Sequence, residues 1–183
     1  GHVESVLALL EGGVDINETN SGDKTSPLLI AAINGHFDLA RLLLEKGADP
    51  KLASTAGATP LYATINVKWA LVAEYPQPEI RNEKTAYLEL MKLMLDRGAD
   101  PNARIRNELW YTGYASSRTQ IDAAGATPLW RAAQSSDVPA MRLLINRGAD
   151  PTIRSTKGQS PLHIAAGADV HGNQEVTALG TWM

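Results

Sequence analysis

The chain has 183 residues, of which 44% are hydrophobic and 20% are charged, and its formal net charge is -3. This composition is ordinary for a globular protein, and the acidic balance makes nucleic acid an unlikely partner because such binders usually carry a basic excess. There is no cysteine, which excludes disulfides and thiolate metal sites and leaves the localisation unknown. Neither a signal peptide nor an apolar run of about eighteen residues is found, so no membrane-spanning segment is expected.

The first predicted helix lies in residues 1–20, where apolar positions are followed by Gly13, Asp15 and Asn17. The next unit begins at Ser26-Pro27-Leu28. A proline there suits the first turn of a helix, where its missing N–H has no partner, and the serine hydroxyl can cap the free backbone donors. A second helix then ends at Gly47, since glycine readily takes the left-handed conformation after a helix.

The same signals recur along the chain with one underlying period. Ser/Thr-Pro-Leu has its proline at positions 27, 60, 128 and 161, with spacings of 33, 68 and 33 residues. Gly-Ala-Asp-Pro begins at positions 47, 98 and 148. The distances between these two signals show a 33-residue period interrupted by one insertion of 18 residues and one of 17. The chain is therefore predicted to be an array of helix–turn–helix repeats.

The predicted array has five segments in a single domain. They are residues 1–20 (the second half of a repeat), 21–53, 54–102 with an insertion between its helices at about 69–86, 103–154 preceded by a loop insertion at about 103–121, and the incomplete repeat 155–183. In the first insertion we expect residues 66–72 to extend the preceding helix, residues 75–78 to form a turn, and the second helix to start early, at Glu83.

The recurring signals resemble the ankyrin repeat, and the fullest form is Ser160-Pro161-Leu162-His163 followed by Ala165-Ala166. The insertions give the chain a further likeness to bacterial proteins with many ankyrin repeats. The resemblance implies an all-α solenoid of about four repeats plus partial ends, with first helices and loop tips on the concave side. It also implies structural roles for His36 and His163, which match positions that bond to neighbouring loops. A single repeat is too small to bury its apolar face, so neighbouring repeats must stack.

Aromatic residues point to a binding surface near repeats three and four, because binding hot spots are enriched in Trp, Tyr and Arg. The candidate partner-binding residues are Tyr62, Asn66, Trp110, Tyr111, Tyr114, Trp130, Arg131 and Gln134. The alternative is that the aromatic residues only pack the long insertions. Packing is the favoured role for Trp69, Tyr87 and Trp110, whereas Tyr111, Tyr114 and Arg131 suit either role equally.

Nothing in the sequence predicts catalysis, a cofactor or a metal site. The four histidines are scattered without ligand spacing. The recurring Asp49, Asp100 and Asp150 are interpreted as loop-forming carboxylates. Neither a nucleophile elbow nor a phosphate-binding glycine loop is found, and the three arginines near the aromatic residues of the second insertion give only weak support for binding single-stranded nucleic acid.

Three functions follow as hypotheses. The first is a protein-binding scaffold that grips a partner on its concave face, since a fold alone does not identify the partner. The second is a self-assembly module, in which the helix in residues 1–20 completes the unfinished repeat at the end of another copy. The third is a targeting domain of an enzyme that lies outside this chain. Both ends lack the polar caps that solenoids need, which suggests a fragment of a longer array or an assembly that covers them.

Overall fold

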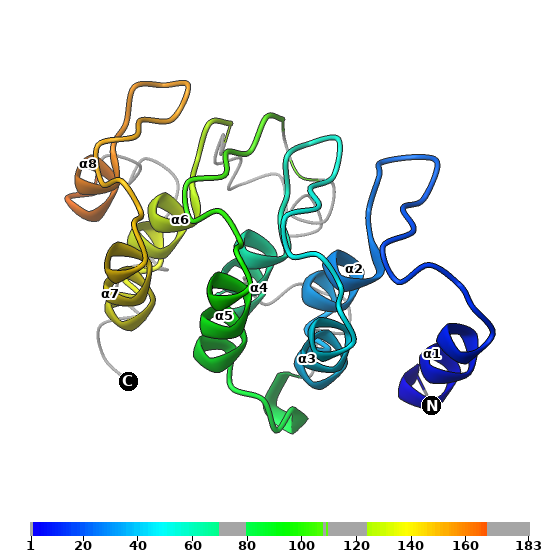
Figure 1. The fold of residues 1–183 in the computed structure, drawn as a ribbon. Helices are drawn as coiled ribbons and strands as arrows, with labels where there is room; N and C mark the ends of the chain where they lie inside the picture. Colours follow the sequence, from blue (N-terminus) through cyan, green and yellow to red (C-terminus); the bar gives the residue numbers. More distant parts are fainter. Residues whose placement is uncertain (1, 70–79, 108, 110–123, 168–183) are drawn as a thin grey trace, which may run out of the picture.

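The computed structural model describes residues 2–69, 80–107, 109 and 124–167, and the regular structure in these residues is helical. The helices are α1 (His2–Glu11), α2 (Pro27–Ile33), α3 (Phe37–Glu45), α4 (Pro60–Lys68), the short 3-10 helix η1 (Ile80–Asn82), α5 (Tyr87–Asp96), α6 (Pro128–Gln134), α7 (Val138–Asn146) and α8 (Pro161–Ala165). Helix pairs stand side by side in one row, with α1 and α8 at opposite ends (Figure 1). The predicted all-α array of helix–turn–helix units is confirmed.

The four helices α2, α4, α6 and α8 begin in the same way and are called first helices below. Each has proline in its first turn and a Ser or Thr side chain that accepts a hydrogen bond from the backbone N–H three residues later. In α6, for example, the bond from Trp130 N to Thr127 Oγ1 is 3.2 Å long. The caps predicted from Ser/Thr-Pro-Leu are therefore present, and they satisfy backbone donors that a helix start leaves free.

The apolar residues form two clusters on opposite sides of the first helices. The main core lies between first and second helices and contains Leu28, Leu61 and Leu129, each at most 1% exposed. A second cluster, called the finger-side core, contains Tyr62 and Trp130 and includes residues of the extended loops. Stacking therefore buries both sides of each inner first helix, as a repeat that cannot fold alone requires.

The extended loops that precede α2, α4, α6 and α8, called fingers below, project from the same side of the row (Figure 1). The fingers before α4 and α8 each contain a tight hairpin, which Ser54 N closes by donating to Ala58 O at 2.9 Å before α4 and Ser155 N by donating to Gln159 O at 2.9 Å before α8. Neighbouring fingers are also linked, since Thr55 N donates to Asp23 O at 2.7 Å. Backbone hydrogen bonds thus couple each repeat to the next along the finger side as well as through the helices.

The hairpin bonds locate the second insertion differently from the predicted residues 103–121. Ile105 N donates to Ala126 O at 3.0 Å, and Gly125 N donates to Ile105 O at 2.7 Å. This pairing is equivalent to that of Ser54 in the preceding finger, so the additional residues fall at the fingertip, between Ile105 and Gly125. Repeat spacing counts the inserted residues, but only the backbone pairing shows where they enter the hairpin.

The first insertion agrees in part with its prediction. Helix α4 has 9 residues whereas α2 and α6 have 7, so the expected extension is present as far as Lys68. Residues 70–72 of the predicted extension and the predicted turn at 75–78 lie outside the described residues. The predicted early start of the next helix is wrong, because α5 begins at Tyr87 and not at Glu83.

Residues 83–85 do not join α5 because they bind the start of α3. Asp38 N donates to Glu83 Oε2 at 2.6 Å, and Thr85 donates to Asp38 Oδ1 from its backbone N at 2.8 Å and from its hydroxyl at 2.7 Å. Burial alone would raise the pKa of Asp38, but hydrogen bonds from Thr85 and Lys84 outweigh it and lower that pKa. This clasp between repeats competes successfully with a further helical turn.

The recurring aspartates form the loops as predicted, and asparagines two residues after them join neighbouring repeats. Lys51 N donates to Asp49 Oδ1 at 2.9 Å, and Asp49 N in turn donates to Asn17 Oδ1 of the preceding repeat at 2.8 Å. Asn102 makes the equivalent bond to Asp150 N at 2.7 Å. In the repeat between them, Lys51 occupies the position equivalent to Asn17 and Asn102. Its ammonium group cannot accept a hydrogen bond.

We therefore expect Lys51→Asn to stabilise the array by supplying the missing acceptor for the Asp100 backbone N–H. The net value of such a hydrogen bond is about 1 kcal/mol. Urea unfolding followed by circular dichroism measures the change in the free energy of unfolding. As a control, Lys51→Ala removes the same charge but supplies no acceptor, and equal stability of the two variants would contradict the explanation.

Candidate functional site

The predicted surface lies at the junction of the third and fourth repeats, where α4 ends beside α6. Arg131 of α6 reaches across this junction and donates from Nε to Asn66 Oδ1 at 2.7 Å and from Nη2 to Trp69 O at 3.3 Å. It also bonds Ser135 at the end of its own helix. Its side chain is only 8% exposed. Arg131 therefore links α4 to α6, and the position of its guanidinium group depends on both helices.

Asp137 is the second connection across the junction. Asp137 is 2% exposed, and its carboxylate caps α7 by accepting a bond from Ala140 N at 3.1 Å. It also accepts bonds from Trp69 Nε1 at 2.7 Å and from the Tyr87 hydroxyl at 3.0 Å. These charge-assisted bonds give the buried carboxylate the partners that it needs away from water. The ends of α4, α5 and α7 are thereby held to one side chain.

Burial raises the pKa of both tyrosines at this junction, so they stay neutral near neutral pH. Burial, reinforced by the negative charge of Asp137, raises the pKa of Tyr87 well above its usual value. Burial raises the pKa of Tyr62 to about 12, although the nearby Arg131 acts in the opposite direction. Lys68 Nζ lies 5.5 Å from the ring centres of both Trp69 and Tyr87, within the range of a cation–π contact.

Besides Arg131, the two aromatic residues predicted to bind a partner on α4 and α6 are buried. Tyr62 is 2% exposed and Trp130 is 0% exposed, and both belong to the finger-side core. The expectation that they touch a partner directly has to be revised, because they pack in the same cluster as Ile105, which precedes the second insertion, and Leu109, which lies within it. The third residue of a first helix faces the fingers, so a bulky side chain at this position fills the finger-side core.

The remaining predicted residues divide into two groups. Asn66 and Gln134 are half-buried at equivalent positions, each six residues after the proline of its first helix. Together with Arg131 they lie at the junction of α4 and α6. Trp110, Tyr111 and Tyr114 lie outside the described residues.

Sequence reasoning missed part of the site. Trp69 and Tyr87, for which packing was favoured, do anchor the insertion through Asp137, yet Trp69 is also 36% exposed. Asp137 was not singled out, although an aspartate directly before Val138-Pro139 is a recognisable helix cap. His163 was expected to bond a neighbouring loop, and it has a 2.7 Å hydrogen bond between its Nδ1 and Ser160 Oγ of its own turn.

The junction also contains hydrogen-bond donors without acceptors. The Nε1 of Trp130 and the Nε2 of Gln134 are buried and have no hydrogen-bond partner. The two residues lie four positions apart on α6, so they occupy the same side of that helix. A buried donor without an acceptor typically costs about 1–3 kcal/mol, so such groups are rare in folded proteins. The Nε2 atom of Gln134 is itself buried, although the residue as a whole is partly exposed.

The described residues contain neither a metal-binding cluster nor a helix that could span a membrane. No group of three or more His, Asp or Glu side chains is placed to hold a metal ion in the part of the chain that the structure describes. The helices of that part are too short or too polar to cross a membrane. The polar junction between α4 and α6 remains the candidate site because it brings together Asn66, Arg131 and Gln134 from the predicted set.

Comparisons with known proteins agree with the observed architecture. The family described as Ankyrin repeats (3 copies) matches residues 1–74 and 83–179. Similar proteins include Ankyrin repeat and SAM domain-containing protein 6 of Danio rerio, 28% identical over 149 residues, which cover 75% of this chain and 19% of that protein. Another is Putative E3 ubiquitin-protein ligase XBAT31 of Arabidopsis thaliana, 30% identical over 151 residues, which cover 82% of this chain and 28% of that protein.

A shorter match is Protein HOS4 of Saccharomyces cerevisiae, 39% identical over 66 residues, which cover 36% of this chain and 6% of that protein. The chain thus spans less than a third of the length of these relatives. The family match extends over nearly all of the described residues, including the capped first helices and the fingers. On this evidence the chain belongs to the ankyrin-repeat family.

Proposed function

We propose that the chain is a protein-binding scaffold and that a partner binds on the predicted concave face, at the junction of α4 and α6. The carrying observation is the Nε2 of Gln134, a donor without an acceptor on a partly exposed side chain. Ankyrin repeats generally mediate protein–protein interactions, and this donor indicates where such an interaction is incomplete. In the proposed complex, Asn66, Trp69 and Gln134 contact the partner. Tyr62 and Trp130 stay buried in the finger-side core and support the helices that carry these contacts.

The chemistry of the junction favours an extended partner segment that presents acceptor oxygens. Rotation of the partly exposed Gln134 side chain would present its Nε2, which has no acceptor, to a backbone carbonyl or a carboxylate of the partner, and the exposed part of Trp69 offers an apolar surface. Arg131 acts as a positioning residue, because its guanidinium is already bonded to Asn66, Trp69 and Ser135. Trp and Arg are among the residue types that contribute most to the binding energy of interfaces, and at this junction both lie near a half-buried polar group.

A peptide selection tests this proposal directly. A random-peptide phage library is selected on the immobilised chain, and the enriched peptides are added to isotope-labelled protein for chemical-shift mapping. The proposal predicts that the largest changes fall on Asn66, Trp69 and the side-chain amide of Gln134. Changes confined to the second helices α3, α5 and α7 would contradict it.

We propose further that the chain itself is not catalytic. The names of some relatives describe enzymes, such as the ubiquitin ligase from Arabidopsis thaliana, but the matched region covers at most 28% of the relatives described above. A binding module that serves a larger protein as its targeting domain is the second candidate. Fusion of the chain to a reporter, compared with the Gln134→Ala fusion, separates targeting from an inert spacer, since only targeting depends on the binding face.

A further inference from the structure

Two aromatic rings near the junction of α4 and α6 share one lysine side chain. Lys68 Nζ lies 5.5 Å from the ring centre of Trp69, at the end of α4, and 5.5 Å from the ring centre of Tyr87, at the start of α5. An ammonium group within about 6 Å of a ring centre is attracted by the negative face of the π system. Because the rings come from two different helices, they offer two walls to a single cation.

The sequence of the third repeat builds this arrangement where the other repeats turn. After α2 the chain turns at Gly35, which has a φ of +73°, and after α6 it turns at Ser136, which has a φ of +54°. Lys68 and Trp69 occupy the positions equivalent to Gly35 and His36, but α4 continues as a helix as far as Lys68. The extension of α4 therefore carries both the cation and one of the rings.

Asp137 holds both rings by their polar edges. Its carboxylate accepts hydrogen bonds from Trp69 Nε1 at 2.7 Å and from the Tyr87 hydroxyl at 3.0 Å, so neither ring can turn away without losing a charge-assisted bond. Asp137 is 2% exposed, and the ion pairs of the described part of the chain do not include it. Solvent screens such a buried charge only weakly. The carboxylate therefore adds to the attraction that the two ring faces exert on a cation.

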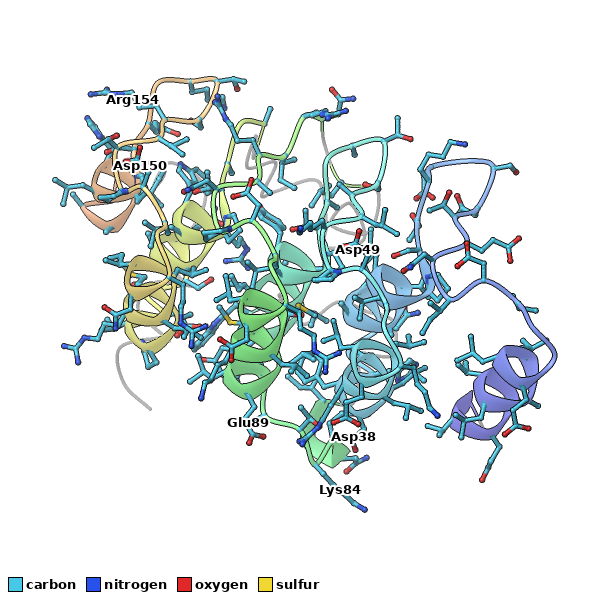
Figure 2. The ribbon with its side chains drawn as sticks, viewed as in Figure 1. Asp38, Asp49, Lys84, Glu89, Asp150 and Arg154 are labelled. Atoms are coloured by element: carbon cyan, nitrogen blue, oxygen red, sulfur yellow. The ribbon has the colours of Figure 1, made fainter. Side chains whose placement is uncertain are left out.

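The arrangement opens to solvent on the side of Trp69. Trp69 is 36% exposed, and Lys68 and Tyr87 are half-buried. Lys84 and Glu89, the charged residues on either side of Tyr87 in the sequence, are exposed and point away from the helices (Figure 2). The cation that lies against the rings is thus Lys68, and a cation from solvent reaches the rings by displacing it.

The resident lysine decides which cation can enter. An unmodified ammonium group has no advantage over Lys68, which is tethered to the site at an effective concentration of about a millimolar or more. Methylation keeps the positive charge of an ammonium group and replaces its N–H donors by methyl groups. Such a cation loses less hydration on entry and gains dispersion contacts with the rings, and aromatic faces are known to bind quaternary ammonium groups.

We propose that Trp69, Tyr87 and Asp137 form a binding site for a methylated ammonium group, and that Lys68 occupies this site in the free chain. In the bound state a methylated lysine side chain of the partner lies against both rings, and the flexible Lys68 side chain moves out to solvent. The assignment to a protein side chain rests on the proposed function, because Trp69 belongs to the proposed binding face. The cation site itself rests only on the contacts described above.

Choline tests the cation site without a partner protein. Its control is neohexyl alcohol, which has the same shape with carbon in place of the charged nitrogen. Both are titrated into isotope-labelled wild-type and Lys68→Ala proteins, and NMR follows the indole N–H of Trp69, assigned from the spectrum of Trp69→Phe. Choline is expected to bind Lys68→Ala roughly tenfold more tightly than the alcohol does, and about fivefold more tightly than it binds the wild type. Lys92→Ala, which removes an exposed lysine of α5, should behave as the wild type.

Three results would overturn the cation site. The first is a Trp69 signal in Lys68→Ala that choline does not shift. The second is equal affinity for choline and neohexyl alcohol, which would mean that the rings offer only an apolar surface. The third is equal choline affinity of the wild type and Lys68→Ala, which would show that Lys68 does not occupy the site. Circular dichroism of Lys68→Ala verifies that the variant is folded.

A short peptide distinguishes a protein side chain from a free small cation. The wild-type chain is titrated with a glycine and alanine peptide that carries one trimethyllysine, and with the same peptide carrying unmodified lysine. The trimethylated peptide is expected to bind roughly tenfold more tightly than the unmodified one and more tightly than choline. Equal binding of the two peptides would overturn the selectivity for methylation, and equally tight binding of choline would overturn the assignment to a protein. Choline has no backbone, so its failure would contradict the cation site alone, whereas the phage-selected peptides test the proposed binding face.

Discussion

Replacing Gly57 with alanine is expected to lower the free energy of unfolding by roughly 3 kcal/mol. Gly57 has a φ of +83°, and a Cβ built there would lie 2.6 Å from the carbonyl oxygen of Arg104 and 3.0 Å from the backbone N of Arg106. Both atoms belong to the backbone of the next finger, so they cannot move without breaking the bond between Arg106 N and Ala56 O. Urea unfolding of the two proteins measures the difference.

Gly148→Ala is the matched control for this substitution. Gly148 has a similar φ of +88°, but a Cβ there would have no atom within 4 Å. Only the conformational cost of the left-handed region remains, which is about 1–2 kcal/mol. Equal losses for the two variants would show that backbone conformation alone is responsible, and that close finger stacking does not contribute to stability.

The second large effect is expected for Asp137→Ala, which should also cost roughly 3 kcal/mol of unfolding free energy. The substitution removes the cap of α7 and leaves Trp69 Nε1 and the Tyr87 hydroxyl without their shared acceptor. The ends of α4 and α5 would lose their attachment to α7. Thermal and urea unfolding measure the loss.

A double-mutant cycle distinguishes the shared acceptor from a simple cap. Tyr87→Phe removes only the hydroxyl, so it should destabilise the wild-type chain by about 1 kcal/mol and should cost much less in the Asp137→Ala background. If the two losses add fully, the hydrogen bond between Tyr87 and Asp137 contributes nothing to stability and the proposed attachment fails.

The sequence was sufficient to predict the repeats and their caps, because these depend on short-range chemistry. Pro60 and Thr59, for example, lie next to each other and define the start of α4 by themselves. The 33-residue period also showed that two insertions exist and how long they are. Where the second one enters depends on the pairing of Ile105 with Ala126, across residues that have no periodic signal.

The candidate site was harder to predict because its contacts join residues far apart in the chain. Trp69 and Asp137 are 68 residues apart, and no local pattern links an indole to a helix cap at that distance. Trp130 was interpreted as a partner contact because aromatic residues mark hot spots, yet a first helix has two buried sides and Trp130 lies on the finger side. The residue type indicates which side chains can contribute strongly to binding. It does not indicate which of them the fold buries in its own core.

The proposed binding face depends most directly on Gln134, whose Nε2 has no hydrogen-bond acceptor. The decisive measurement is the Kd of the selected peptide for the wild-type chain, for Gln134→Ala and for the control Lys92→Ala. Loss of one hydrogen bond of about 1 kcal/mol predicts roughly fivefold weaker binding by Gln134→Ala, and Lys92→Ala should bind as the wild type does. Equal affinity of all three proteins would contradict the proposed binding face.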